Sequence, residues 1–192
     1  MVSKIKIGLS FALVLVLAGC AVKPVKTVSV FNRGEREDLY QLTSWAFEGR
    51  VALRRDNESW TANITWKRRL ADENIRLSGP LGQGGMVIHI SEDFVGIDRG
   101  EGEIRYPDRS DEFITEQLGF YVPFKSLRYW VIGLVDPEAA FEDIENGFVQ
   151  NGWTVLIRQM QQTEVGMMPR KIDVSNGEVK LKLIIDQWQE HV

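Results

Sequence analysis

The strict alternation of apolar and polar residues constrains the fold of this chain more than any other feature. Every second residue of the segment 45–53 is apolar or glycine, and the segment 60–67 repeats the pattern with Trp60, Ala62, Ile64 and Trp66. A period of two is typical of a β-strand that buries one face. Asp56-Asn57 separates the two segments and has the composition of a tight turn. The sequence therefore predicts an antiparallel hairpin with one apolar face.

Further strands are expected along the chain, and a helical region interrupts them. Asn176-Gly177 is a strong two-residue hairpin signal near the C-terminus. Apolar residues recur with helical spacing in the segments 111–118 and 126–134, and a short helix is expected at 35–43. The additional strands are predicted at 74–78, 86–91, 94–98, 103–106, 153–160, 170–174 and 178–188.

The order of these elements favours a single curved sheet. Roughly nine strands follow one another as a meander, which is the arrangement of antiparallel sheets and up-and-down barrels. We expect a mainly β protein with helices, in which residues 35–192 form a single open-barrel domain. Its curved antiparallel sheet would form an incompletely closed β-barrel. The helices at 111–134 would cover a hydrophobic cavity on the concave side.

The N-terminus has the features of an export signal. A basic start precedes a mostly apolar segment at 7–17, which is too short to cross a bilayer. Leu17-Ala18-Gly19-Cys20 follows, and small residues directly before a cysteine form a lipobox. An ordinary signal peptide with a cysteine there by chance is the alternative. We expect a lipoprotein signal peptide at 1–19, lipid attachment at Cys20 and a lipidated tether at 20–34.

Composition and motifs argue against several functional classes. The formal net charge of −4 becomes −6 once the two lysines of residues 1–19 are removed, and no basic cluster interrupts the sequence, so a nucleic-acid partner is not expected. His89 lies mid-strand, where a solvent-facing or hydrogen-bonded role is expected, and His191 lies next to the chain end. Catalytic and metal-binding motifs are not found. We therefore expect that the protein is not an enzyme and that it binds no metal and no cofactor.

The glycine-rich segment 79–85 predicts a tight turn with an unusual tip. Pro80 and Gly82 flank Leu81, so that an apolar residue occupies a position that is normally polar. Leu81 could fold back and cap the core. It could instead remain exposed and insert into a bilayer or a partner, where one buried leucine contributes about 1.5–3 kcal/mol. That energy would orient a tethered protein without anchoring it.

Aromatic residues on the apolar strand faces have two interpretations. They could be ordinary core residues, or they could line a ligand-binding hollow, because a long curved sheet does not fill its own concave side. Strand face and helix stripe predict which residues would line such a hollow. The candidates are Trp45, Phe47, Leu53, Trp60, Trp66, Met86, Ile88, Trp130, Leu134 and Leu183.

Several of these segments together resemble the LolB family of outer-membrane lipoprotein receptors. The lipobox, the strand 45–52 with its Gly-Arg pair and the turn Gly79-Pro80-Leu81-Gly82 agree with that family. The most specific match is the segment 122–134, which ends in Trp-Val-Ile-Gly-Leu. The closing segments Met168-Pro169 and 179–183 also agree. Val135 is a departure, since a proline commonly follows Gly-Leu in the family.

The resemblance implies a function without covalent chemistry. Such a protein would accept lipoproteins from a periplasmic carrier of the LolA type, hold their acyl chains in its hydrophobic cavity and insert them into the outer membrane. Leu81 would then be the membrane-directed tip. The resemblance implies a monomer on the periplasmic leaflet, and Ala21 after the cysteine is consistent with outer-membrane sorting. An envelope lipid-binding or scaffold lipoprotein that transfers no cargo is the alternative, and an envelope hydrolase is a more distant one.

Overall fold

The computed structural model describes residues 27–28, 31–79, 84–107, 110–119, 121–164 and 166–189. The expected signal peptide at 1–19, Cys20, the residues Pro80, Leu81 and Gly82, and His191 lie outside these described residues.

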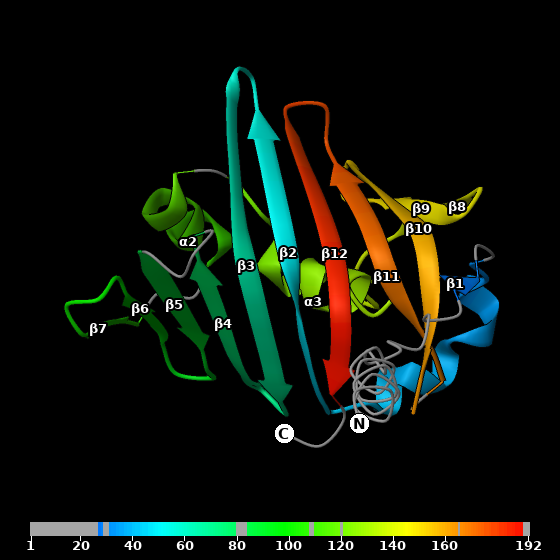
Figure 1. Ribbon diagram of the computed structural model, residues 1–192, viewed down its shortest axis with the longest axis horizontal. Helices are drawn as coiled ribbons and strands as arrows, with labels where there is room; N and C mark the ends of the chain where they lie inside the picture. The colour runs from blue at the N-terminus through cyan, green and yellow to red at the C-terminus, as the bar shows by residue number, and fades with distance from the viewer. Residues whose placement is uncertain are drawn as a thin grey trace, which may run out of the picture.

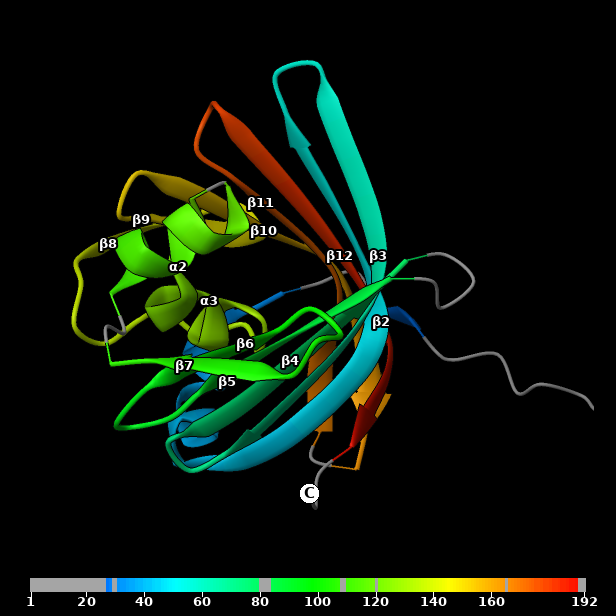
Figure 2. The same cartoon turned by 90° about the vertical axis from the view of Figure 1, so that its left-hand side faces the viewer.

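The strands form one antiparallel sheet that curls without closing. Its order is β7-β6-β5-β4-β3-β2-β12-β11-β10-β9-β8, and β1 pairs with β10 beside this path. Figure 2 shows the sheet curving around the helices, with β7 and β8 at its two free ends. The open-barrel prediction is confirmed. The strands are β1 Thr27–Val28, β2 Ser44–Arg55, β3 Glu58–Arg69, β4 Asp72–Ser78, β5 Gly85–Ile90, β6 Val95–Asp98, β7 Glu103–Tyr106, β8 Phe141–Ile144, β9 Gly147–Gln150, β10 Trp153–Thr163, β11 Gly166–Ser175 and β12 Val179–Gln189.

The hairpin of β2 and β3 is the centre of the sheet (Figure 1). The two strands pair along their whole length, from Ser44 opposite Arg69 to Arg55 opposite Glu58. Asp56 adopts a left-handed backbone conformation with φ of 51° in the predicted turn. Alternate residues are buried over the middle of both strands, as the period of two predicts, whereas Trp45, Ala46 and Phe47 are buried in succession and β3 is exposed at its start. Each strand therefore presents one face to the core and the other to solvent.

Three strands were not predicted, namely β1 in the expected tether and the pair β8 and β9. β8 and β9 lie between the helices and β10, where the sequence is acidic and has no apolar alternation. Their pairing with each other and with β10 determines their conformation. The short helix expected at 35–43 is instead two 3-10 turns, Arg33–Glu35 and Glu37–Gln41.

The folded part of the chain begins before the expected boundary at residue 35. Thr27 and Val28 pair with Gln161 and Met160 of β10. Phe31 is buried and belongs to the main hydrophobic cluster. Part of the expected tether therefore packs against the domain.

Two short helices occupy the concave side of the sheet (Figures 1 and 2). α2 spans Asp111–Leu118, and the Ser110 hydroxyl accepts a hydrogen bond from the Phe113 N–H as its N-cap. α3 spans Phe124–Trp130 and is shorter than the predicted 126–134. The helix ends early because residues 131–133 form turns, with Gly133 at a φ of 76°.

Polar contacts with β9 hold the end of α3. The Trp130 indole N–H donates to Gln150 Oε1 at 2.8 Å, and the Gln150 amide donates to the carbonyl oxygens of Asp136 and Ala139. The Ser126 hydroxyl donates to Asp136 Oδ2 at 2.8 Å. The unpredicted strand β9 therefore fixes the segment that follows α3.

A buried carboxylate links α3 to the sheet. Glu73 of β4 is 1 % exposed. Its Oε2 accepts a hydrogen bond from the Trp66 indole N–H, with an N···O distance of 3.0 Å. Its Oε1 lies 3.0 Å from Arg128 Nε on α3. Burial raises the pKa of Glu73 above its ordinary value of 4.5, while Arg128, Arg68 and the Trp66 hydrogen bond act in the opposite direction. The desolvation cost is thus only partly offset.

Replacing Gly49 with alanine is expected to destabilise the sheet. A Cβ at this position would overlap the backbone carbonyl of Ile184 on β12, and backbone atoms cannot move aside cheaply. We expect Gly49→Ala to lower the free energy of unfolding by about 1–3 kcal/mol in urea titrations. Gly85→Ala is the control, because its nearest new contact is Leu77 O at an ordinary 3.4 Å. Equal stability of the two variants would contradict the close approach at Gly49.

Replacing Glu73 with glutamine is expected to change the pH dependence of stability. Because the folded pKa of Glu73 is raised, the folded protein binds more protons than the unfolded chain above about pH 4.5, so this group's contribution to stability falls as pH rises through the folded pKa. The Tm of Glu73→Gln minus that of wild type should therefore increase over that window. Glu48→Gln, at an exposed position of β2, is the control. A Tm difference that is constant with pH would contradict the prediction.

Candidate functional site

An apolar cavity lies between the concave face of the sheet and α3. Its lining consists entirely of apolar side chains from β2, β3, β4, β5, β12 and the segment 122–131. The cavity volume is about 50 Å³, little more than the roughly 30 Å³ that one water occupies in the liquid. Phe124, Leu127 and Val131 reach into it from the helical side. In this conformation the helical segment therefore occupies most of the hollow that the sheet encloses.

A wider hollow adjoins the cavity at the free end of the β2–β3 hairpin. It has a volume of about 600 Å³ and shares Leu53, Trp60 and Leu77 with the cavity. Trp60 is 39 % exposed, which is unusual for a large apolar side chain. We call this hollow the mouth. It connects the apolar interior with solvent.

A charged side chain spans the mouth. Arg55, at the end of β2, donates from Nη1 to the carbonyl oxygen of Gly119 after α2, at 2.5 Å. Its Nη2 lies 3.3 Å from Glu58 Oε2. Both contacts are at exposed positions, where they contribute little stability. Arg55 thus connects the hairpin to the end of α2 without closing the mouth tightly.

The sequence-based cavity candidates fall into two groups. Leu53, Trp60, Trp66, Ile88 and Leu183 line the cavity, and Met86 lines the mouth. The other four are buried outside the lining. They are Trp45, Phe47, Trp130 and Leu134.

Those four residues have different surroundings. Trp45 and Phe47 stack on each other with centroids 6.0 Å apart, and both contact Trp66 and Trp188. Trp130 packs 6.2 Å from Trp153 behind α3. Trp45 and Phe47 therefore belong to an aromatic cluster beside the cavity, and Trp66 is the member of this cluster that lines the cavity.

Sequence reasoning missed several lining residues. Val51, Ile64, Ile75, Leu77 and Leu181 lie on the same strand faces as the predicted ones, so the alternation itself could have identified them. The helical contributors depend on how the segment 122–131 is placed, and periodicity does not contain that information.

The opposite side of α3 faces a polar hollow of about 640 Å³. Lys125, Arg128 and Asp136 line it, and Phe124 borders both this hollow and the apolar cavity. Burial raises the pKa of Asp111 at its edge. α3 is thus an amphipathic wall between an apolar and a polar space.

A buried arginine supports the turn after α3. Arg36 Nη2 donates to the carbonyl oxygen of Ile132 at 2.5 Å, and Nη1 donates to that of Met167 at 2.6 Å. Burial lowers the pKa of Arg36 to about 10. Its guanidinium lies against Gly133, where a Cβ would approach Arg36 Nε to 2.8 Å. This contact joins the helical segment to β11.

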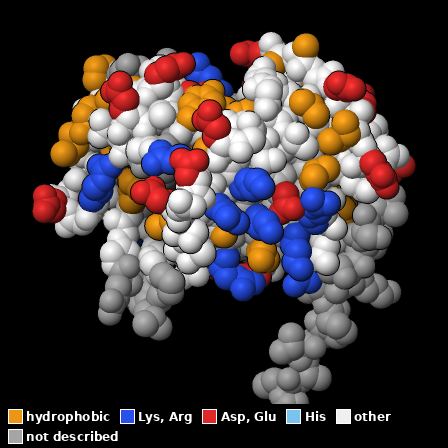
Figure 3. Space-filling model, turned by 90° about the horizontal axis from the view of Figure 1, so that it is seen from above, with side chains coloured by type: hydrophobic (Ala, Val, Ile, Leu, Met, Phe, Trp, Pro, Cys, Tyr) orange, Lys and Arg blue, Asp and Glu red, His pale blue; other side chains and the backbone are white. Residues whose placement is uncertain are grey.

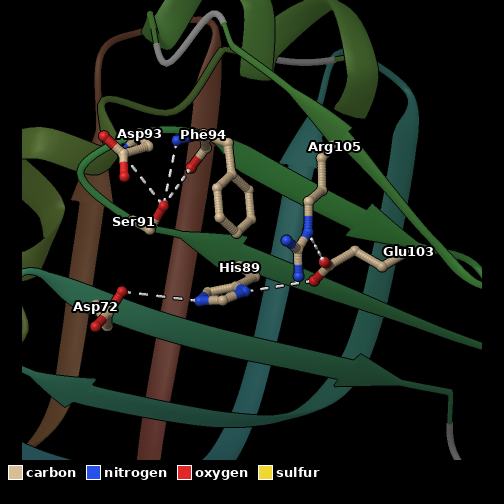
Figure 4. Close-up of polar contacts among 7 residues, drawn as sticks. All are labelled: Asp72, His89, Ser91, Asp93, Phe94, Glu103 and Arg105. Atoms are coloured by element: carbon tan, nitrogen blue, oxygen red, sulfur yellow. Dashed lines mark hydrogen bonds and ion pairs between the residues drawn. The ribbon is translucent and has the colours of Figure 1, made fainter.

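His89 lies in a small polar network on the outer side of β5 (Figure 4). Its Nδ1 is 3.3 Å from Glu103 Oε2 and its Nε2 is 3.9 Å from Asp72 Oδ1. The ring also packs edge-on against Phe94 at 5.1 Å. The described residues contain no group of three or more histidine, cysteine or acidic side chains able to hold a metal ion.

The base of the predicted membrane-directed turn is described, although its tip is not. Ser78 pairs with Gly85 across β4 and β5, and the Gly79 N–H donates to the Gly84 carbonyl at 3.3 Å. Gly84 has a φ of 63°. The described residues on either side of 80–83 are therefore paired as in a regular hairpin.

Comparison with known proteins finds a family that matches most of the chain. A family model described as Outer membrane lipoprotein LolB matches residues 43–188. An outer-membrane lipoprotein LolB of Chromohalobacter salexigens is 32 % identical, covering 98 % of this chain and 92 % of its own length. That of Alkalilimnicola ehrlichii is 28 % identical, covering 91 % and 92 %.

Among solved structures, a LolA superfamily protein from Nitrosomonas europaea aligns with a TM-score of 0.45 at 8 % identity, covering 86 % of this chain and 94 % of that protein. Within the described part of the chain, no helix is long and apolar enough to cross a membrane. The family match begins directly before β2 and ends in β12, so it spans both helices and all strands of the sheet except β1. The chain therefore belongs to the LolB family of outer-membrane lipoproteins.

Proposed function

We propose that this protein accepts lipoproteins from a periplasmic LolA-like carrier and inserts them into the outer membrane. The observation that carries the proposal is the cavity whose lining is entirely apolar, with a mouth at one end. Acyl chains are the part of a lipoprotein that such a surface would bind, because the hydrophobic effect is proportional to the apolar area removed from water. The residues that we propose for acyl binding include Leu53, Trp60, Trp66 and Leu183.

Movement of α3 would create the necessary space. The cavity of about 50 Å³ is too small for a fatty acyl chain while Phe124, Leu127 and Val131 remain in place. An entering chain would cover the sheet surface that these side chains leave, so the apolar face of the sheet would stay out of water. The polar hollow behind α3 gives the helix room to move.

Transfer by this route would use no covalent chemistry, metal or cofactor. The acyl chains would pass from the carrier's apolar site to this cavity and then to the bilayer, in order of increasing affinity. Acylation at Cys20 would hold the protein on the periplasmic leaflet, since two or more acyl chains give stable anchoring. We further propose that it acts as a monomer.

Leu81 would act in the last step. A hydrophobic turn tip next to the bilayer would favour release of cargo into lipid, and its contribution of about 1.5–3 kcal/mol is suited to orientation. Pro80 and Gly82 would restrict the shape of this tip.

The alternative is a lipoprotein that binds lipid without passing cargo on. Both functions would use the cavity, so the discriminating measurement is transfer. Incubating the purified protein with a cargo-loaded carrier should move cargo to it, whereas acyl binding without cargo uptake would favour the alternative.

Replacing Trp60 with alanine is expected to weaken cargo uptake. The side chain lines both the cavity and the mouth and is already partly exposed, so its removal should leave the fold intact. Loss of about 1.4 kcal/mol of apolar contact would reduce cargo uptake from the carrier about tenfold. Thr61→Ala, on the opposite face of β3, is the control. Equal transfer by the two variants would contradict an acyl-binding role for Trp60.

Replacing Leu81 with glutamate is expected to separate receipt from delivery. A charge at the tip resists entry into the bilayer, so release of cargo into liposomes should fall while uptake from the carrier is retained. Gln83→Glu, which adds the same charge in the same turn, is the control. Wild-type delivery by Leu81→Glu would exclude the membrane role. Unfolding by Leu81→Ala would instead indicate that Leu81 caps the core.

A further inference from the structure

The outward face of the sheet carries cations that the proposed function does not use. Residues that alternate with the cavity-lining ones point away from the core, and on β2 and β12 these include Arg54, Lys180 and Lys182, all exposed. Figure 3 looks down on the hairpin ends of these strands and shows Lys and Arg side chains gathered on the side of the convex face. We call Arg54, Lys180 and Lys182 the basic band.

The strand register brings these like charges together. Arg54 is the direct cross-strand partner of Lys180, and Lys182 is the next outward residue of β12. The neighbours beyond the pair are Ser59 on β3 and Ser175 on β11, which carry no charge. Like charges directly opposite each other destabilise an antiparallel pair. The band therefore lowers the stability of the folded protein, and its cross-strand neighbours Ser59 and Ser175 do not offset this repulsion.

The nearby acidic residues do not neutralise the band. Asp173 lies opposite Lys182, but its carboxylate is 2.8 Å from Arg158 Nε. Asp186 is 3.0 Å from Arg50 Nη2. In the part of the chain that the structure describes, no carboxylate lies within 4.0 Å of the band's cations. A chain with a net charge of −4 thus keeps an uncompensated positive surface.

The band lies on the same face of the sheet as the base of the turn at 79–84. Ser78, where the turn begins, pairs with Asn63, and Asn63 pairs with Arg50 on β2. Arg50 is therefore two strand spacings, about 10 Å, from the base of the turn, and Arg54 lies four residues, or about 13 Å, further along the same strand. The cations and the turn base belong to the same face of the sheet.

We propose that the basic band binds the phosphate groups of anionic phospholipids and holds the convex face of the sheet against the membrane. The family places the protein at an outer membrane, so a lipid surface is always within reach. Each cation near an anionic surface favours the bound state about fivefold, and three favour it about a hundredfold. With the convex face on lipid, the mouth on the concave side remains accessible to an arriving carrier.

Lysine labelling in vesicles tests the inference on the full-length protein. The protein is reconstituted into phosphatidylcholine vesicles with or without phosphatidylglycerol, and acylation of each lysine by an amine-reactive reagent is followed by mass spectrometry. Lys180 and Lys182 should react several-fold more slowly in the anionic vesicles, and high salt should remove the difference. Lys125, exposed on α3, is the internal control and should react equally in both.

A charge reversal provides the second arm. Arg54→Glu places opposite charges across β2 and β12, which favours the strand pair, so the variant should fold. Protection of Lys182 by phosphatidylglycerol should nevertheless be lost. Arg99→Glu changes the net charge by the same amount at a position outside the band. This variant should retain the protection of Lys182.

Three results would overturn the inference: equal protection in neutral vesicles, protection retained in Arg54→Glu, or protection that appears only when the carrier is added, which would indicate a protein partner. Cargo transfer is measured separately, so failure here leaves the proposed function untouched.

Discussion

The structure depends on the need to cover the apolar inner face of an open sheet. A closed small barrel fills its interior with its own side chains, whereas this sheet leaves β7 and β8 unpaired with each other and its concave side accessible. The segment 122–131 supplies the missing apolar surface with Phe124, Leu127 and Val131. Because this cover is a short helix and not a strand of the sheet, its removal would break no hydrogen bond of the sheet ladders.

The cover is held by a mixture of strong and weak contacts. Its inner side packs on apolar strands, while its outer side borders a polar hollow and includes Arg128, which pairs with the buried Glu73. Burial of that carboxylate is only partly compensated, so the pair holds the helix in position at an energetic cost. This partial compensation supports the movement of α3 that we propose for acyl binding.

One strand pattern produces two functional faces. On β2, Val51 and Leu53 contribute to the cavity, while Arg50 and Arg54 point outward. The period of two makes these roles inseparable in sequence, since a shift of register by one residue would exchange them. The bilayer-facing and acyl-binding surfaces that we propose therefore lie on opposite sides of the same few strands.

The sequence by itself determined the strands with clear alternation, the hairpins at Asp56-Asn57 and Asn176-Gly177, and five of the cavity residues, because burial of one face is written locally in the period of two. Only the tertiary structure decided the rest. β8 and β9 have no apolar period; β9 forms because β10 offers it a partner, and β8 forms by pairing with β9. Trp45 and Phe47 share a strand face with Leu53, yet the sheet's curvature places them against Trp188 instead of the cavity. Such long-range packing is decided by the curl of the whole sheet, which no local pattern records.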